Sequence, residues 1–353
     1  MMSIRTHIVL AIVAILAGGV LVEVTEPQTE ELLRYGRSLL SGAGQDDGTT
    51  VTLDTAGIPL VDYGELEDIA VGAQRNPVAI CQHAFHCFDN MSDSPSVYFR
   101  QALGCANWLV DSAEVHTHGA ILPYRFAYPR YGLRENWLSA MAQAQAVQVM
   151  VRTHGLTGDS KFLDHARSLL GVFFVDVDSG GVTHKRLAGT SGWWYEEYAA
   201  PDGDDPRVLN GMLFVLVGLN ELYEYSGDTT SELLFARGLK AVVDLLAHYD
   251  RNGHSYYDAL GNPVGGDYHQ VHIDLLDTLY RLTGRSTLAK YRDRWRAYAD
   301  SPLVVRLVRA PTRMGPVVLA VNVLITLAVL ELGLIARSRR RNASRTVASG
   351  TGR

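Results

Sequence analysis

Apolar residues recur at the spacing of amphipathic helices through most of the middle of this 353-residue chain. From Pro77 onward, apolar positions three and four residues apart favour helices over strands. We expect helices over residues 97–110, 138–151, 161–173, 208–225, 232–248, 269–282 and 288–298. The pattern therefore predicts a mainly α-helical protein.

Turn-forming residues divide these helices into hairpins. Segments 155–158 and 226–228 supply Gly, Thr, Ser and Asp, and Asp159 and Ser160 precede a helix as candidate caps. Segment 124–128, Tyr-Arg-Phe-Ala-Tyr, is a short β-prone interruption. Helix hairpins with short β-hairpin insertions are typical of an α/α toroid, so we expect an incomplete barrel of the (α/α)6 kind.

Two apolar segments lie at the ends of the chain. Residues 8–24 follow Arg5, and residues 316–336 precede a cluster of arginines. About 20 apolar residues cross a bilayer, and basic flanks stay in the cytoplasm. We therefore expect two transmembrane helices at the cell membrane, with both termini cytoplasmic and the central domain extracytoplasmic. A cleavable signal peptide is the alternative for the first segment.

These features divide the chain into five parts. They are an N-terminal transmembrane segment or signal anchor at 1–24, a stalk or irregular entry at 25–75, a helical domain at 76–313, a transmembrane helix at 314–336 and a basic cytoplasmic tail at 337–353. The entry segment is expected to be irregular because it carries a Gly- and Asp-rich run and little periodicity.

Charge and cysteine content narrow the possible functions. The formal net charge of −6 argues against a nucleic-acid partner, which requires a basic surface. Cys81, Cys87 and Cys105 allow one disulfide, between Cys87 and Cys105, and leave one thiol. A zinc site formed by Cys81, His83, His86 and Cys87 is the other interpretation, but these positions fan around a helix, so ordinary packing is favoured.

Four short motifs follow one another along the helical region. They are Asn-Pro-Val-Ala-Ile from Asn76, Trp-Leu-Ser-Ala-Met-Ala-Gln-Ala-Gln-Ala from Trp137, Trp-Trp-Tyr-Glu-Glu-Tyr from Trp193 with Val-Leu-Asn-Gly from Val208, and Tyr-Asp from Tyr257 with Asp-Tyr-His-Gln-Val-His-Ile from Asp267. Their order over residues 75–300 resembles the catalytic domain of the D-glucuronyl C5-epimerases. Between Tyr257 and Tyr268 the chain is shorter than the animal enzymes.

The resemblance implies roles for individual residues. Tyr198, Tyr257 and Tyr268 are expected at the reacting sugar, with Glu197 as an acid or base beside Tyr198. The expected substrate contacts are Gln143, Trp194, Tyr195, Glu196, Asn210, His269 and His272. No cofactor and no metal is implied, although the spacing of His269 and His272 on one helix face leaves metal ligation as an alternative.

Two arginines are candidates on chemical grounds. Arg125 and Arg130 lie in an aromatic-rich loop, and a guanidinium binds a uronate carboxylate through paired hydrogen bonds. Asn210 and Gly211 have a structural alternative, in which Asn210 caps a helix and Gly211 permits close packing.

The chemistry of epimerisation accounts for such residues. The hydrogen beside a carboxylate is a very weak acid, so the site must stabilise developing negative charge and must hold a proton-transfer group on each face of the sugar. We therefore expect an isomerase that converts D-glucuronate to L-iduronate within a glycosaminoglycan-like polysaccharide, as in heparan sulfate biosynthesis. A second copy of the chain is a candidate partner. The alternatives are a polysaccharide lyase, which shares the first step, and a non-catalytic, membrane-tethered glycan-binding domain.

Overall fold

The computed structural model describes residues 10–15, 17–22, 50–310 and 315–350. The chain forms two compact units. The larger unit spans Asp47–Ala299, and the smaller one combines Met1–Asp46 with Asp300–Arg353.

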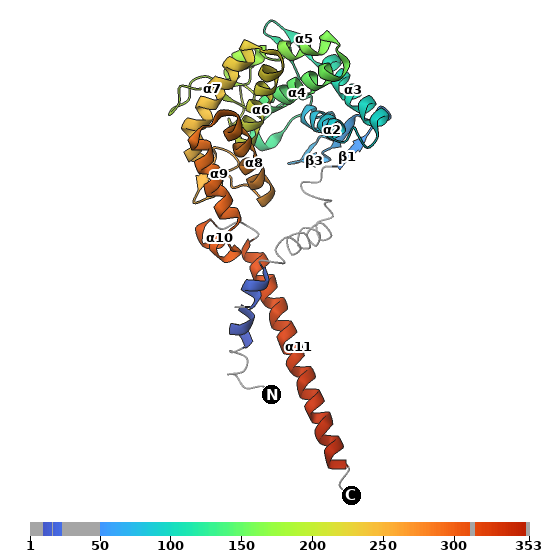
Figure 1. The fold of residues 1–353 in the computed structure, drawn as a ribbon, viewed down its shortest axis with the longest axis vertical. Coiled ribbons are helices and arrows are strands. Elements are labelled where there is room, and N and C mark those ends of the chain that lie inside the picture. Colours follow the sequence, from blue (N-terminus) through green and yellow to red (C-terminus); the bar gives the residue numbers. More distant parts are fainter. Residues whose placement is uncertain (1–9, 16, 23–49, 311–314, 351–353) are drawn as a thin grey trace. The chain divides into compact units, whose positions relative to one another are not determined.

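Helices dominate the described part of the larger unit (Figure 1). They are α2 (Pro77–Asp89), α3 (Pro95–Ser112), α4 (Ala140–Thr157), α5 (Ser160–Ser168), α6 (Leu209–Ser226), α7 (Thr229–Leu245), α8 (Gly266–Thr283) and α9 (Ser286–Ala299). Four 3-10 turns accompany them: η2 (Pro129–Tyr131), η3 (Gly171–Phe174), η4 (Val177–Ser179) and η5 (Leu246–Tyr249). The mainly helical fold is confirmed, and an α-helix lies in each of the seven expected ranges, although the one expected over 161–173 ends at Ser168.

The helices are arranged as successive hairpins. Neighbouring helices pack in pairs, α2 with α3, α4 with α5, α6 with α7 and α8 with α9. The first members also pack on one another in the order α2, α4, α6, α8, which forms an inner layer (Figure 1). Within the described residues the arc contains four hairpins, fewer than the six of a complete (α/α)6 ring.

The inner layer is the core of the larger unit. Nearly every residue of α4 from Ala140 to Val151 is buried, as expected of a helix enclosed on all sides. Small residues allow the close approach of α4 and α6, since a Cβ on Gly218 would lie 2.6 Å from the Ala144 carbonyl oxygen. The two central helices therefore form a rigid base for the loops at their ends.

Side-chain caps fix where four of these eight helices begin, namely α2, α4, α5 and α7. Asp159 accepts a hydrogen bond from the Lys161 amide at 3.0 Å, and Asp228 accepts one from the Ser231 amide at 2.8 Å. Helix α6 differs, because Val208 is its N-cap and the Leu209 amide donates to the Tyr257 carbonyl at 3.0 Å. The expectation that Asn210 caps this helix is wrong, because Asn210 lies inside the first turn.

Short antiparallel strands fill the connections. They are β1 (Thr50–Leu53), β2 (Pro59–Asp62), β3 (Glu65–Leu66), β4 (Ile69–Ala70), β5 (Ala73–Gln74), β6 (Glu114–His116), β7 (Gly119–Ile121), β8 (Thr183–His184), β9 (Trp194–Tyr195), β10 (Asp250–Arg251) and β11 (His254–Ser255). One sheet has the order β1-β2-β5, and the others are two-stranded. Residues 50–75 are thus a small β region rather than an irregular entry, and residues 25–49 lie outside the described residues.

The smaller unit contains the apolar ends of the chain. Its described elements are a helix over Leu10–Val22, α10 (Leu303–Arg309) and α11 (Gly315–Gly350). Gly18 packs closely on α11, since a Cβ there would lie 2.9 Å from the Val323 Cα, and Val22 is buried with Leu303 and Val318. The Leu10–Val22 helix therefore lies against α11.

Only one helix among the described residues is long and apolar enough to span a membrane. It is the segment Gly315–Arg337 of α11, whose 23 residues correspond to a length of about 34 Å. The helix Leu10–Val22 is too short to qualify, so the expectation of two transmembrane helices is corrected to one candidate. Residues 1–9, 16, 23 and 24 of the expected N-terminal segment lie outside the described residues.

The three cysteines are buried free thiols. The expected Cys87–Cys105 disulfide is therefore not formed. Burial raises the pKa of Cys87 to about 11 and that of Cys105 to about 12, so both thiols are protonated at neutral pH. Among the described residues no cluster of His, Cys, Asp and Glu has the arrangement of a metal site.

Candidate active site

Three segments that are distant in sequence meet at the start of α6. The backbone of Glu196 bonds to two other parts of the chain. Its amide donates to the Val182 carbonyl at 2.7 Å, and its carbonyl accepts from the Ala140 amide at 2.9 Å. The Tyr257 carbonyl, as described above, holds the first amide of α6. These contacts place Glu197, Tyr198 and Tyr257 in one neighbourhood.

An aromatic cluster surrounds the ring of Tyr198. Tyr128 stacks on it with ring centres 5.4 Å apart, Tyr131 lies at 4.8 Å and Trp137 at 5.6 Å. The Tyr131 hydroxyl donates to Asp258 Oδ2 at 3.2 Å, which ties the cluster to the segment that carries Tyr257. The Tyr198 side chain is therefore held in one orientation by packing on several sides.

The phenols of Tyr198 and Tyr257 lie close enough for each to affect the pKa of the other. Burial, followed by the charge of Glu197, raises the pKa of Tyr198 well above its usual value. The same two causes raise the pKa of Tyr257. Both phenols therefore carry their protons at neutral pH and can act as proton donors.

Glu197 is the titrating group beside these phenols. Its side chain is half-buried, and its Oε2 atom is buried without a hydrogen-bond partner. Burial and then the charge of Glu196 raise the pKa of Glu197 to about 8, while the Tyr198 hydroxyl acts in the opposite direction. A carboxyl group with that pKa can accept and release a proton near neutral pH.

Tyr268 approaches the pair from a different helix. It lies in the first turn of α8, and its ring packs edge-on against that of Tyr257 with centres 5.6 Å apart. The residue is 49% exposed, so its ring can be reached by a ligand. The four residues predicted as catalytic, Glu197, Tyr198, Tyr257 and Tyr268, thus lie together.

The two candidate arginines have different surroundings. The Arg125 guanidinium forms an ion pair with Glu114 and donates to Asn136 Oδ1 at 2.7 Å. Arg130 instead lies over the rings of Tyr131 and Tyr257, at 5.4 Å and 5.7 Å from their centres. No carboxylate of the part of the chain that the structure describes forms an ion pair with Arg130. Arg130 is therefore the better placed cation for a substrate carboxylate, in contrast to the expectation for Arg125.

Glu196 has a structural role. It is fully buried and accepts hydrogen bonds from the Tyr198 amide at 3.3 Å and the Arg207 amide at 2.9 Å. His184 lies 3.5 Å from Glu196 Oε2, and although burial lowers the pKa of His184, the charges of Glu196, Asp205 and Asp176 raise it more. The contacts of Glu196 hold the loop between residues 196 and 207, and its expected contact with substrate stays a prediction.

Three other expected substrate contacts belong to the core. Trp194 is fully buried and stacks on Tyr249 with ring centres 5.5 Å apart, and the buried Tyr195 hydroxyl donates to the Leu234 carbonyl at 2.6 Å. Gln143 is buried and bonds the Leu122 amide at 2.8 Å and the Ala120 carbonyl at 3.0 Å. Each of these side chains is buried, and the substrate-binding role expected for them stays a prediction.

His269 and His272 are also buried rather than exposed to a ligand. Ser255 Oγ lies 2.8 Å from Nδ1 of both histidines, and the Ser255 amide donates to His269 Nδ1 at 3.2 Å. His269 Nε2 lies 3.2 Å from the Trp295 carbonyl, so this nitrogen carries the proton. Burial, with His269 and His254 nearby, lowers the pKa of His272 to about 3, so it is neutral. The two histidines link β11 to α8, and their expected contacts with substrate stay a prediction.

Asn210 lies in the first turn of α6, close to the cluster formed by Glu197, Tyr198, Tyr257 and Tyr268. It is only 3% exposed, and its Oδ1 atom is buried without a hydrogen-bond partner. A buried acceptor without a donor is uncommon in native proteins. Asn210 therefore remains a candidate for substrate binding.

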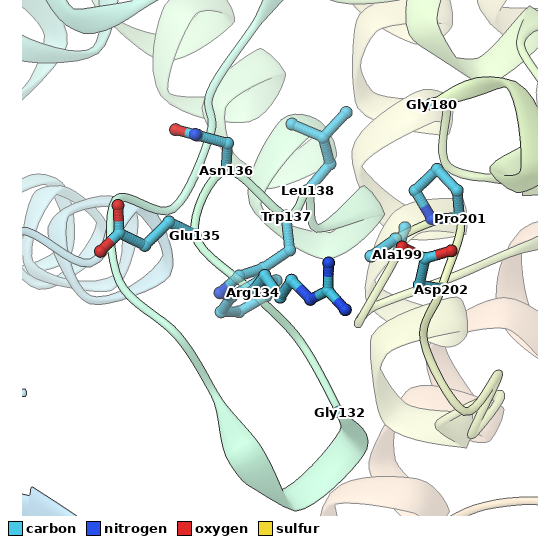
Figure 2. Close-up of a pocket in the computed structure, with 11 residues that line it drawn as sticks. Gly132, Arg134, Glu135, Asn136, Trp137, Leu138, Gly180, Ala199, Pro201 and Asp202 are labelled. Atoms are coloured by element: carbon cyan, nitrogen blue, oxygen red, sulfur yellow. The ribbon is translucent and has the colours of Figure 1, made fainter. Parts of the chain in front are cut away.

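A pocket of about 240 Å³ borders the aromatic cluster (Figure 2). Arg134, Glu135 and Asn136 line one side, and Ala199, Pro201 and Asp202 line the other, with Trp137 and Leu138 between them. Trp137 also packs on Tyr198, so the pocket and the cluster share one aromatic side chain. A ligand bound at Tyr198 therefore has space to extend into this pocket.

Comparisons with known proteins agree with this geometry. A sequence model described as "D-glucuronyl C5-epimerase C-terminus" matches residues 117–297. The chain belongs to the D-glucuronyl C5-epimerase C-terminus family. All the residues of the catalytic cluster, and Arg130, lie inside the segment that matches the family.

Individual relatives cover different shares of their own length. A D-glucuronyl C5-epimerase of Caenorhabditis elegans is 29% identical over 288 residues, which are 76% of this chain and 43% of that protein. An uncharacterized protein of Methanocaldococcus jannaschii is 27% identical over 261 residues, 69% of this chain and 84% of that protein. The cellobiose 2-epimerase of Spirochaeta thermophila resembles the structure at 14% identity with a TM-score of 0.45, over 64% of this chain and 59% of that one.

The sequence motifs did not identify every residue of the candidate site. Tyr128, Tyr131 and Trp137 surround Tyr198, and none of them was expected as a site residue. The segment 124–137 is rich in aromatic residues, which could have indicated a binding site. Periodicity could not show which of these residues reach Tyr198. Arg130 differs from Arg125 only in its contacts, which spacing does not reveal.

Proposed function

We propose that this protein is an epimerase that inverts C5 of D-glucuronate residues, giving L-iduronate, within a polysaccharide. The observation that carries the proposal is the buried Glu197 carboxyl with a pKa of about 8, adjoining two phenols and with a third phenol nearby on another helix. Binding alone requires no carboxyl group tuned to neutral pH. Membership of the epimerase family supports the same reaction class.

The geometry suggests how the two faces of the sugar are served. Tyr198 and Tyr257 each affect the pKa of the other, and the charge of Glu197 raises the pKa of both, so the three groups adjoin one another. Both therefore belong to one face, together with Glu197. Tyr268, which is exposed and belongs to α8, is the phenol available for the opposite face.

The proton transfers follow from these positions. On one face Glu197, as the carboxylate, takes the proton that leaves C5, either directly or through Tyr198, and the electron pair of the C–H bond passes into the carboxylate to form an enediolate. On the other face the Tyr268 hydroxyl gives its proton to C5, and the resulting phenolate is reprotonated from solvent. The reverse reaction uses the same groups in exchanged roles.

Arg130 is the residue proposed to stabilise the intermediate. The enediolate carries two negative charges on the former carboxylate, and a fixed cation is the strongest means of lowering their energy. Arg130 lies over Tyr257 without a carboxylate partner in the described structure, so its charge is available to the substrate. The pocket beside Trp137 is proposed to hold a neighbouring sugar of the polymer.

Nuclear magnetic resonance in heavy water tests the proposed reaction. The full-length protein is incubated with glucuronate-containing polysaccharides in D2O, with Glu197→Gln as the control for catalysis. Deuterium at C5 together with new iduronate signals supports the epimerase. Unsaturated chain ends would show a lyase instead, and binding without exchange for every polymer would show a glycan-binding protein.

We also propose that α11 anchors the protein in the cell membrane with the larger unit outside. The Gly315–Arg337 segment is long enough to span, and arginines follow it in the sequence, which favours a cytoplasmic C-terminus. Protease added to intact cells should digest the larger unit while a C-terminal tag stays protected. Protection of the larger unit and digestion of the tag would show that the orientation is the opposite one.

A further inference from the structure

The first turn of α6 carries a glycine that directly contacts Glu197. If Gly211 had a Cβ, the three nearest atoms would all belong to Glu197, with its Cβ at 2.7 Å, its Cδ at 2.9 Å and its Oε2 closer still. Real Cβ atoms do not approach other heavy atoms so closely. Any side chain at position 211 would therefore displace the Glu197 carboxyl group.

The backbone of Gly211 does not require glycine. The residue lies within α6 and is not among the glycines with positive φ. Glycine is less favourable in a helix than alanine, because it has more backbone freedom to lose on folding. Its presence is accounted for by the space that it leaves for Glu197.

Two unsatisfied acceptors mark the same turn. Glu197 Oε2 and Asn210 Oδ1 are both buried, and neither has a hydrogen-bond partner among the residues that the structure describes. Since unpaired buried acceptors are costly, their presence beside Gly211 indicates that the turn is built to hold the Glu197 carboxyl where it can exchange a proton.

We propose that Gly211 is a positioning residue of the reaction, whose missing side chain admits the Glu197 carboxyl into the first turn of α6 and holds it beside Tyr198. This inference rests on the proposed function for its catalytic readout. Its structural basis, the contact between positions 211 and 197, is independent of that function.

Gly211→Ala tests the proposal, with Gly155→Ala as the matched control. Gly155 lies in α4, and a Cβ there would meet the Tyr225 hydroxyl at an ordinary 3.7 Å. Gly211→Ala should lower kcat at least tenfold with little change in KM, because Arg130 and the aromatic cluster stay in place. Gly155→Ala should retain the kcat of the unmodified protein.

The pH profile gives a readout that a purely structural role would not change. The displaced carboxyl of Gly211→Ala is more solvated, so the acidic limb of its kcat profile should move to lower pH, while that of Gly155→Ala stays unchanged. A Gly211→Ala enzyme with kcat within twofold of the unmodified protein and the same limb would overturn the proposal.

If Gly211→Ala folds poorly, a double-mutant cycle of melting temperatures still tests the proposed contact. Glu197→Gly removes every atom that the new Cβ would approach, so Gly211→Ala should lower Tm in the natural background and leave it equal or higher in the Glu197→Gly background. Equal destabilisation in both backgrounds would contradict the proposed contact. The cycle needs no substrate, so it also stands if the epimerase activity itself is absent.

Discussion

The guanidinium carbon of Arg130 lies 5.7 Å from the centre of the Tyr257 ring. The pair brings a positive charge to the edge of a cluster whose other ionisable members are phenols and a carboxyl group. A uronate carboxylate that entered beside Tyr257 would meet this charge, and neutral sugars would not gain from it.

Replacing Arg130 is expected to weaken catalysis more than folding. Arg130→Gln should reduce kcat/KM by about 10- to 100-fold, since a charge-assisted hydrogen bond contributes about 1.5–3 kcal/mol. Arg125→Gln is the matched control, because Arg125 is paired with Glu114 and should leave kcat/KM nearly unchanged. Steady-state kinetics checks both variants, and an equal loss in the two would contradict the role of Arg130.

The raised pKa of Glu197 predicts a specific pH dependence of stability. The folded state retains a proton at Glu197 up to a pKa of about 8, whereas the unfolded chain releases it near pH 4.3. Stability should therefore decrease as pH rises between these values. Glu197→Gln cannot ionise, so its Tm relative to the natural protein should be higher at pH 9 than at pH 5. Thermal melts at several pH values check this, and a pH-independent difference would show that Glu197 has an ordinary pKa.

The helices and the proximity of the four candidate residues could both be predicted from the sequence, but for different reasons. Apolar spacing identified α3 to α9 because inner and outer helices bury regular stripes of side chains. The cluster of Glu197, Tyr198, Tyr257 and Tyr268 came from motif order, which carries information that periodicity lacks. Their proximity is a feature of tertiary structure, set by the Tyr257 carbonyl at the start of α6.

Several expected substrate contacts fall on polar residues that have buried partners, and their binding role stays a prediction. Gln143, Glu196, His269 and His272 look like ligand-binding residues in a sequence, yet each satisfies main-chain or side-chain groups inside the protein. A sequence does not show whether a polar side chain faces a cleft or an unpaired amide. The β region at 50–75 was also missed, because its strands are only two to four residues long.

Ser255 is predicted to stabilise the link between β11 and α8. Ser255→Ala leaves the Nδ1 atoms of His269 and His272 without their shared hydroxyl, which should cost about 1–3 kcal/mol. Ser226→Ala, which removes one bond to the Leu222 carbonyl at the end of α6, should cost less than about 0.5 kcal/mol. Urea denaturation measures both, and equal free energies of unfolding would mean that the histidines do not depend on Ser255.

Charged residues in α11 should release the protein from the membrane. Leu324 and Val329 are 64% and 63% exposed near the middle of the Gly315–Arg337 segment. Arginine at both positions should cost about 2.5–3.5 kcal/mol each on insertion and move the protein to the soluble fraction. Val115→Arg, on exposed β6, is the control and should leave the fractionation unchanged. Persistent membrane association of the double variant would contradict the anchor.

The most direct test of the account separates proton exchange from inversion at C5. Purified polymers containing only glucuronate or only iduronate are incubated in D2O with Tyr268→Phe and, separately, with Glu197→Gln. A variant that lacks the group on one face can still exchange the C5 hydrogen through the other face without inverting the carbon. The account predicts that each variant loses inversion and that the two retain exchange with opposite epimers. Exchange of the same epimer by both variants, or inversion by Tyr268→Phe at the natural rate, would contradict the assignment of Glu197 and Tyr268 to opposite faces.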